Sequence, residues 1–336
     1  MKKRIVFLFP TVQKRFGPNF FFTFTGQNRS FCQRVLYPFA QSASRIDWKG
    51  ETGQAITKNV YPSTLMRSLM QAEIVARHAP EEYEVLSTTM PHMSGCIVIL
   101  NKFLINKRPL LHYLKLRGNT ILADMVDGRF KLDARLHLVD GLICCSHKGR
   151  DYYASAQSRV PVFFVEHCID ARLPEVTPPD NAFSAWYFGA PQNLYGREAI
   201  EDAVHISYTE SEKKPATAWI DDLPKANFYY AVRPKIKELR FKPFTKGGIA
   251  AWCKANILVH KDDGDALQYL GEEYPYLIRE ELGEEVVRRY LAKAREDFGG
   301  ERWRFGLSIM RNIRERYLEQ TLARQFWTMI QELGSA

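Results

Sequence analysis

Short apolar segments alternate with helix-like stretches through the first half of the chain, and this alternation restricts the fold more than any other feature. Such a pattern is typical of parallel β-sheets whose strands are joined by crossover helices. Between the segments, "PSTLMRSLMQAEIVARHA" has apolar residues at helical spacing, and "KRPLLHYLKLRG" ends in Gly118, a helix stop signal. The strand-like segments are "RIVFLF", "CIVIL", "NTILADMV", "GLICCS" and "VPVFFVEH".

The same alternation starts again after a proline-rich stretch that runs from Pro174 to Pro179. Such a stretch is typical of a linker between domains. A chain of 336 residues is also long enough for two domains of ordinary size. We therefore predict an α/β fold with two Rossmann-like parallel-sheet domains, 1–172 and 180–290, that face each other across a cleft. The strand-like segments of the second domain are "SAWYFG", "AVHISYT", "NFYYAV" and "ANILVH".

Residues 291–336 form a third predicted region, made of one or two amphipathic helices. Apolar side chains recur there at three- and four-residue steps, with arginines between them. Such a region either packs against a domain or lies on a membrane surface. Its aromatic and leucine side chains favour packing, and we expect these helices to return toward the first domain.

The composition is that of a globular protein, with 46% apolar and 25% charged residues. The formal net charge of +9 favours an anionic partner, such as a nucleotide, a lipid headgroup or a nucleic acid, unless it serves solubility alone. The six cysteines have no C-x-x-C spacing, which favours a reduced, cytoplasmic setting. The apolar run in "MKKRIVFLFP" lacks a cleavage site, so it is better interpreted as a first buried strand than as a signal peptide.

Polar residues follow several predicted strands, and open parallel sheets bind their ligands beyond the carboxyl ends of the strands. Asp124 and Asp127 follow one strand of the first domain, and His167 follows another. Gly189 and Arg233 hold the corresponding positions in the second domain. A carboxylate or an imidazole at such a place can accept a proton in catalysis. An aspartate directly before a glycine can equally form a turn, and an arginine at a strand end can pair with a surface carboxylate.

The stretch "FKPFTKGGIAAWCKANILVHKDDGDALQYL" places two lysines beside a pair of glycines. Lys242 and Lys246 supply two cations, and Gly247-Gly248 allows the backbone to approach a ligand and offer N–H groups to an anion. This pattern favours a phosphate-bearing ligand. Both lysines could instead be solvated surface residues.

Together these segments resemble glycosyltransferases of the GT-B type, over about residues 119 to 278. "VDGLICCSHKGRDYYASAQSRVPVFFVEHCIDARL" is similar to the end of their first domain, and "SAWYFGAPQ" to the opening strand and loop of their nucleotide-binding domain. "FYYAVRPKIKELRFKPFTKGGIAAWCKANILVHKDDGDALQYLGEEYPYL" is similar to their donor-binding stretch. The sequence departs from the family's pair of glutamates separated by seven residues, which leaves the acidic ligand and the stereochemical outcome open.

The resemblance implies that a nucleotide-sugar donor binds in the second domain, with no metal ion and no further cofactor. Lys246, together with Arg233 or Lys242, would bind the donor's phosphates and neutralise the leaving group. Gly247 and Gly248 would let the following helix present its first N–H groups to the same phosphates.

Three further positions complete the donor site that the resemblance implies. One aspartate of Asp262, Asp263 and Asp265 would accept hydrogen bonds from ribose or sugar hydroxyls, and Asp265 is the one we include in the site. Gly189 lies in the opening loop of the domain, and Tyr274 would stack on or donate to the donor, although a packed turn is an alternative role for this tyrosine.

In the first domain, an inverting enzyme needs a group that takes the proton of the acceptor hydroxyl. Asp124, Asp127 and His167 are the predicted catalytic residues. If none of them acts as the base, the aromatic loop from Gly17 to Gln41 is the next candidate, because it could line the cleft.

We therefore predict a glycosyltransferase that moves a sugar from a nucleotide-sugar to a glycan or lipid-linked acceptor in polysaccharide biosynthesis. One alternative is a catalytically silent scaffold that binds the nucleotide-sugar, and another is a sugar-nucleotide epimerase, which would need no acceptor. A nucleic-acid-binding protein is disfavoured because the basic residues are scattered. We expect a cytoplasmic protein that can associate with the inner face of a membrane.

Overall fold

The computed structural model describes residues 2–10, 62–127, 136–157, 159–209, 217–234 and 240–335. The predicted loop from Gly17 to Gln41 lies outside these residues. Among the described residues, no helix combines the length and apolar character needed to cross a bilayer.

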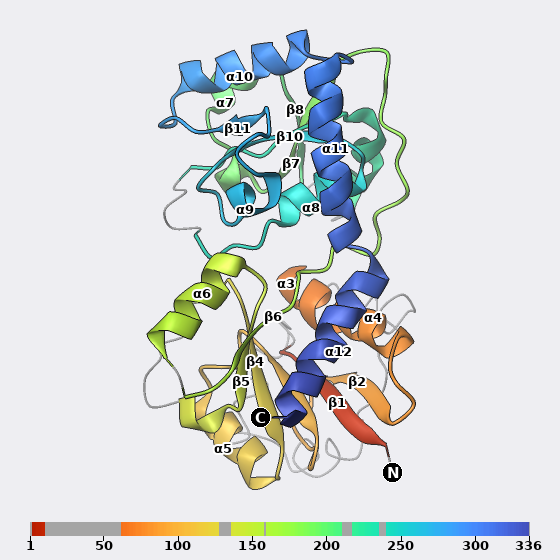
Figure 1. The fold of residues 1–336 in the computed structure, drawn as a ribbon, viewed down its shortest axis with the longest axis vertical. Coiled ribbons are helices and arrows are strands. Elements are labelled where there is room, and N and C mark those ends of the chain that lie inside the picture. Colours follow the sequence, from red (N-terminus) through yellow and green to blue (C-terminus); the bar gives the residue numbers. More distant parts are fainter. Residues whose placement is uncertain are drawn as a thin grey trace, which may run out of the picture. The chain divides into compact units, whose positions relative to one another are not determined.

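The chain divides into two compact units, each built on one parallel sheet (Figure 1). This arrangement confirms the predicted α/β class with two Rossmann-like parallel sheets and C-terminal helices. The domain boundaries 1–172, 180–290 and 291–336 stay predictions about independently folding parts. The first unit holds Met1–Cys145, Arg150–Cys168 and Leu322–Ala336, and the second holds Ser146–Gly149 and Ile169–Thr321.

The first unit contains a six-stranded sheet in the order β2-β1-β3-β4-β5-β6, with every neighbouring pair parallel. Its central strands are buried on both faces, as expected for a sheet covered by crossover helices. The strands are β1 (Lys3–Leu8), β2 (Tyr83–Thr88), β3 (Ile97–Asn101), β4 (Thr120–Val126), β5 (Gly141–Cys144) and β6 (Val162–Phe164).

The first helical stretch among the described residues of this unit runs from Pro62 to Arg77 and changes its hydrogen-bonding pattern along the way. It consists of α3 (Pro62–Thr64), the π-helical segment η3 (Leu65–Met70) and α4 (Gln71–Arg77). π-Helical segments are rare and often accompany a functional or strained position. The other helical elements are α5 (Arg108–Leu116), the short 3₁₀ turn η4 (Leu136–Leu138), α6 (His147–Ala156) and α12 (Glu319–Ser335).

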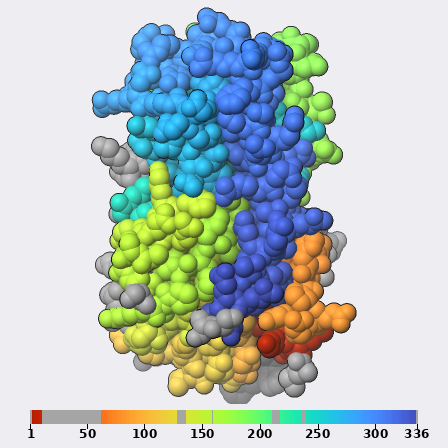
Figure 2. All heavy atoms as spheres, in the orientation of Figure 1, coloured from red at the N-terminus to blue at the C-terminus, as the bar shows by residue number. Residues whose placement is uncertain are grey.

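Helix α12 supplies part of the hydrophobic core of the first unit. Phe326 stacks on Phe7 of β1 with ring centroids 5.7 Å apart, and Trp327 lies 4.9 Å from the ring of Tyr83. The opposite face of the helix is at the surface visible in Figure 2. The apolar side chains of α12 are therefore used for packing, the interpretation that the sequence favoured over a membrane-surface helix.

The second unit contains a five-stranded parallel sheet in the order β11-β10-β9-β7-β8. After β7 the chain adds β8 on one side and then β9, β10 and β11 on the other, so the strand order reverses between β7 and β9. The strands are β7 (Ala185–Gly189), β8 (His205–Tyr208), β9 (Phe228–Tyr230), β10 (Asn256–His260) and β11 (Leu277–Ile278).

Short helical elements join these strands, and two longer helices complete the unit. Helix α11 packs closely against the sheet, because a Cβ atom at Gly306 would lie 2.5 Å from Oδ1 of Asn256 on β10. The elements are η5 (Pro191–Asn193), α7 (Arg197–Ile200), η6 (Ala218–Lys225), α8 (Thr245–Trp252), α9 (Ala266–Leu270), α10 (Glu284–Glu296) and α11 (Glu301–Arg316).

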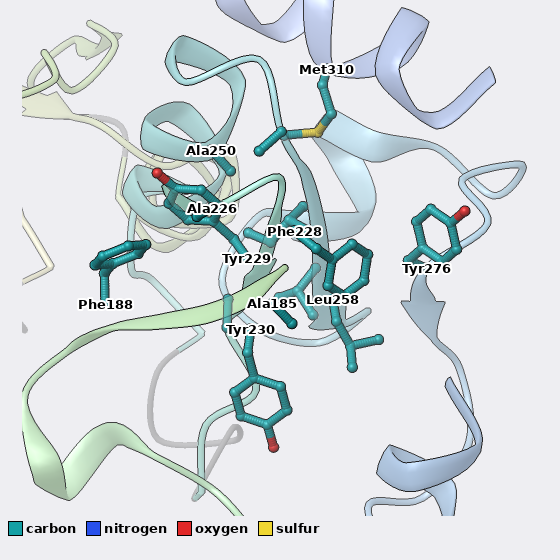
Figure 3. Close-up of a cluster of buried hydrophobic side chains, with 14 of the residues drawn as sticks. Ala185, Phe188, Ala226, Phe228, Tyr229, Tyr230, Ala250, Leu258, Tyr276 and Met310 are labelled. Carbon is teal, nitrogen blue, oxygen red and sulfur yellow. The ribbon is translucent and has the colours of Figure 1, made fainter. Parts of the chain in front are cut away.

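The core of the second unit is rich in aromatic rings that lie on both faces of β9. Tyr229 packs against Phe188, with ring centroids 5.0 Å apart, whereas Phe228 packs against Tyr276 at 5.3 Å (Figure 3). Neighbouring residues of a strand point to opposite faces, so this alternation follows from the strand geometry.

The structure confirms every strand that the sequence predicts and adds two at sheet edges. β2 ("YEVLST") is partly exposed over its first half, and β11 is only two residues long, so neither shows a continuous apolar run. The predicted helix from Pro62 is present, as is the helix ending before Gly118. The C-terminal region forms α11 and α12, while α10 is an additional amphipathic helix.

Candidate functional site

The reversal of strand order between β7 and β9 places two predicted residues at the carboxyl edge of the second sheet. Gly189 is the last residue of β7, and Arg233 follows the end of β9. Asp263 follows the end of the next strand, β10. Open parallel sheets bind ligands at such a reversal. The fold thus brings together residues that are far apart in the sequence.

Lys246, the second residue of α8, points its ammonium group to the same place. Its Nζ atom lies 4.1 Å from the centre of the Tyr187 ring. A Cβ atom at position 189 would lie 3.1 Å from Nζ and 2.6 Å from the Tyr187 hydroxyl oxygen, so only glycine fits there. Although the residue as a whole is partly exposed, Nζ is buried and has no hydrogen-bond acceptor among the described residues.

The charges around Lys246 are unbalanced. Arg233 donates from Nη1 to Oδ1 of Asp263 at 3.3 Å, and its buried Nε has no acceptor in the described part of the chain. Burial lowers the pKa of Lys246 well below its usual value, and the neighbouring Arg233 lowers it further, while Asp263 opposes the shift. Buried donors without acceptors are costly, so this cluster is suited to an anion.

The glycine pair after Lys246 is required for packing. A Cβ atom at Gly247 would lie 1.9 Å from the Phe244 ring, and one at Gly248 would lie 2.5 Å from the Tyr317 ring. The first turn of α8 has no side-chain cap. A packing role accounts for both glycines, and their predicted approach to phosphates stays a prediction.

Two predicted donor-binding residues have other partners. Asp265 is fully buried and accepts hydrogen bonds from the backbone N–H groups of His147 at 2.5 Å and Lys148 at 3.1 Å. Tyr274 is also fully buried; its hydroxyl accepts from the N–H of Ile257 at 2.8 Å and donates to Asn256. In this structure Asp265 holds the segment Ser146–Gly149 and Tyr274 belongs to the core, and their predicted roles in donor binding stay predictions.

Lys242 lies before α8 and raises the local positive potential, since it is among the groups that lower the pKa of Lys246. Of the three aspartates that the resemblance offered, Asp263 is the one in the cluster, because it pairs with Arg233. The sequence alone could not select it from the run "DDGD".

In the first unit, Asp124 is fully occupied by a buried arginine. Oδ2 of Asp124 accepts from Nε of Arg67 at 2.9 Å, and Oδ1 accepts from Nη2 at 3.1 Å. Nη1 of Arg67 also donates to the backbone oxygens of Val165 at 3.3 Å and Glu166 at 2.8 Å. Burial is the largest single effect and lowers the pKa of Arg67, but attraction to Asp124, Cys145 and Cys168 and the hydrogen bonds to Asp124 together raise it. This pair joins the end of β4 to the segment after β6.

Arg67 was missing from the predicted catalytic residues, although it is the one charged residue in the first part of the helical stretch, "PSTLMRSLMQA". It lies on the π-helical segment η3. A charged residue at a buried helical position is rare unless it is paired. The position of Arg67 among apolar residues could therefore have indicated a buried, paired arginine.

Asp127 differs from Asp124 in its exposure. Its Oδ1 accepts from Nζ of Lys102 at 2.5 Å, and about a quarter of its side chain is exposed. The residue before it, Val126, has a φ of 51°, which is unusual for a β-branched side chain, and β4 shifts its register here. Strained backbone of this kind occurs at functional sites.

His167 is buried and neutral. Nδ1 lies 2.7 Å from the backbone oxygen of Cys168, so Nδ1 carries the proton and donates. Burial, reinforced by Arg67, lowers the pKa of His167 to about 3. Asp127 and Lys102 also act on this pKa, which places the three side chains near one another. His167 can therefore accept a hydrogen bond through Nε2, but it is a weak base.

The fold matches solved structures of glycosyltransferases. A glycosyltransferase from Rickettsia africae matches with a TM-score of 0.57 and 9% identity, over 99% of this chain and 98% of that chain. HepE from Anabaena, solved in complex with UDP-glucose, matches with a TM-score of 0.53 and 12% identity, over 98% of this chain and 99% of HepE.

The pneumococcal O-GlcNAc transferase GtfA, solved with UDP and GlcNAc, matches with a TM-score of 0.52 and 10% identity over 80% of this chain. The chain spans 60% of the length of GtfA. No family model and no curated protein matches the sequence. Identities this low concern the fold alone, and at that level the resemblance is confirmed: the chain has the GT-B-like fold of these glycosyltransferases.

Proposed function

We propose that this protein is a glycosyltransferase that transfers a sugar from a nucleotide-sugar donor. The observation that carries the proposal is the buried Nζ of Lys246, which has no acceptor among the described residues and lies beside Arg233. Both groups lie where the strand order of the second sheet reverses, and the fold is one that glycosyltransferases share. A diphosphate would supply acceptors for Nζ of Lys246 and Nε of Arg233, which have none among the described residues.

The chemical role of this cluster follows from the bond that breaks. As the bond between the sugar and the diphosphate is cleaved, negative charge builds up on the leaving phosphate. Lys246 and Arg233 would stabilise that charge, with Lys242 adding to the positive potential. We propose that these side chains make a metal ion unnecessary, so transfer should persist in the presence of EDTA.

Asp127 is our first choice for the group that takes the proton of the acceptor hydroxyl. Asp124 would have to give up two hydrogen bonds to Arg67 in order to act as a base. His167 has too low a pKa to hold a proton well near neutral pH, although Nε2 could orient the hydroxyl. Asp127 is the most exposed of the three carboxylate and imidazole groups.

We choose the donor to test first from the ligands of the similar solved structures. HepE was solved with UDP-glucose, and GtfA with UDP and GlcNAc, so a UDP-sugar is the first donor to test. The acceptor that we propose is a glycan or a lipid-linked sugar, and the cytoplasmic location and membrane association stay predictions.

The test combines binding with turnover. Thermal-shift measurements against UDP-, GDP- and ADP-linked sugars should show a rise in apparent stability with at least one donor, because a ligand of the folded state stabilises it. Asp127→Asn should then lower the release of nucleoside diphosphate in the presence of acceptor by roughly 10² to 10⁴, with donor affinity unchanged.

Asp151→Asn is a matched control, because Asp151 is an exposed carboxylate that pairs with an exposed arginine on α6. Failure of every donor to stabilise the protein would contradict the proposed function. Donor binding without any release of nucleoside diphosphate would indicate a silent binding protein, and donor conversion without an acceptor would indicate an epimerase.

A further inference from the structure

The groups around Lys246 determine whether its amine carries a proton. Four groups face the ammonium position from the elements around it: Tyr187 on β7, Arg233 after β9, Asp263 after β10 and Lys242 before α8. Among the described residues, therefore, one carboxylate meets three cationic side chains. That carboxylate is already hydrogen-bonded to Arg233.

We infer that Lys246 is a neutral amine in the ligand-free protein and takes up a proton when the diphosphate of the donor binds. This inference rests on the proposed function, because it needs an anion to bind at the cluster. A charged ammonium here would be buried next to the guanidinium of Arg233 and without an acceptor in the described part of the chain, and proton loss relieves both penalties. The diphosphate brings negative charge and acceptor oxygens, so the protonated form of Lys246 becomes the more stable one when the donor is bound.

The Tyr187 ring makes the two states structurally compatible. Its face supports Nζ at 4.1 Å, while its hydroxyl donates to the backbone oxygen of Ala190 at 2.7 Å and fixes the ring. The ring thus holds Nζ at a fixed place next to Arg233 and Asp263, so a change in the charge of Lys246 needs no movement of the Tyr187 ring.

A consequence is that donor affinity depends on pH. At a pH above the pKa of Lys246 in the free protein, the binding of each donor molecule is accompanied by the uptake of one proton from solution. The affinity should then fall by up to about tenfold for each pH unit, until the pKa in the complex is reached.

The first experiment needs no ligand. Unfolding by urea is compared for the natural protein and Lys246→Met at about pH 7, 8 and 9. The unfolded lysine holds its proton over this range, whereas the folded one does not, so the natural protein should gain stability as the pH rises. Its unfolding constant should fall by up to about tenfold per pH unit relative to that of Lys246→Met. A ratio that does not change with pH would overturn the inference.

The second experiment counts protons on binding. Calorimetric titration with UDP-glucose at about pH 8, in two buffers of different ionisation enthalpy, gives the number of protons taken up. UDP-glucose lacks the terminal phosphate that titrates near about pH 6, so a proton taken up from the buffer is bound by the protein and not by the ligand. We expect uptake close to one proton for the natural protein and for Lys254→Met, an exposed lysine at the end of the same helix.

The outcomes separate the two proposals. Binding of UDP-glucose without proton uptake would overturn the inference and leave the proposed function intact. A Lys246→Met variant that still binds and takes up as many protons as the natural protein would have the same consequence. Absence of any donor binding would count against the proposed function, while the ligand-free experiment would still decide the ionisation of Lys246.

Discussion

Two buried basic groups, the guanidinium of Arg67 in the first unit and Nζ of Lys246 in the second, differ in their hydrogen-bond partners. Arg67 makes four hydrogen bonds, two of them to Asp124. Lys246 has only the face of the Tyr187 ring and, among the described residues, no acceptor. A buried charge whose donors are all satisfied holds a structure together, whereas one without acceptors indicates a place for a ligand.

The largest effect that tests this contrast should come from Arg67→Met. The change leaves the carboxylate of Asp124 buried and without its partner, so it should lower the free energy of unfolding by about 3 to 5 kcal/mol. Urea unfolding followed by circular dichroism measures it. Lys246→Met, at about neutral pH, should instead leave the stability unchanged or raise it, because it removes a buried group that has no acceptor among the described residues.

A double variant sharpens the comparison. Arg67→Met together with Asp124→Leu removes both charges and should recover part of the lost stability. If Arg67→Met alone costs no more than Lys246→Met, the two basic groups do not differ as we describe.

The next effect concerns binding. Lys246→Ala should weaken the affinity for a nucleotide-sugar by about 1 to 3 kcal/mol, the range for a lost charge-assisted hydrogen bond, and leave the fold intact. Calorimetric titration measures the affinity, and circular dichroism checks the fold. Lys254→Ala is the matched control, because its Nζ lies 3.7 Å from an exposed glutamate and away from the cluster. Equal affinities for the two variants would remove Lys246 from the donor site.

The smallest effect concerns His167 and depends on pH. Its folded pKa, about 3, lies below the value of an unfolded histidine, so the unfolded chain binds the extra proton first as the pH falls. The first unit should therefore lose about 1 kcal/mol of stability between about pH 6.5 and 5.5. His167→Asn, which keeps an amide donor near the Nδ1 position, should not show this loss. The same acid sensitivity in the variant would indicate another titrating group.

Much of the fold follows from local sequence patterns. Central strands of a parallel sheet are buried on both faces, so they appear as continuous apolar runs, and all of the predicted runs are strands. Edge strands lack this signature, which is why β2 and β11 were missed. The helix from Pro62 was predicted from its spacing, but nothing in a periodic pattern could show that its middle is π-helical or that Arg67 is buried.

The predicted donor residues divide in the same way. The residue types and their place after strands predicted that Gly189, Arg233, Lys242 and Lys246 lie near one another, because the carboxyl ends of parallel strands meet at one edge. Asp265 and Tyr274 fit the same pattern but have hydrogen-bond partners elsewhere in the second unit, since a run such as "DDGD" does not say which carboxylate pairs with Arg233.

By itself, the sequence determined that this chain forms two parallel sheets and that basic residues follow the strands of the second. Only the tertiary structure decided which charged side chains pair with an opposite charge. Asp124 and Arg67 are 57 residues apart, and Arg233 and Asp263 are 30 apart, yet each pair is hydrogen-bonded. The free energy of a buried charge depends on its partners in space, and these are set by sheet order and helix packing, which no local stretch of sequence encodes.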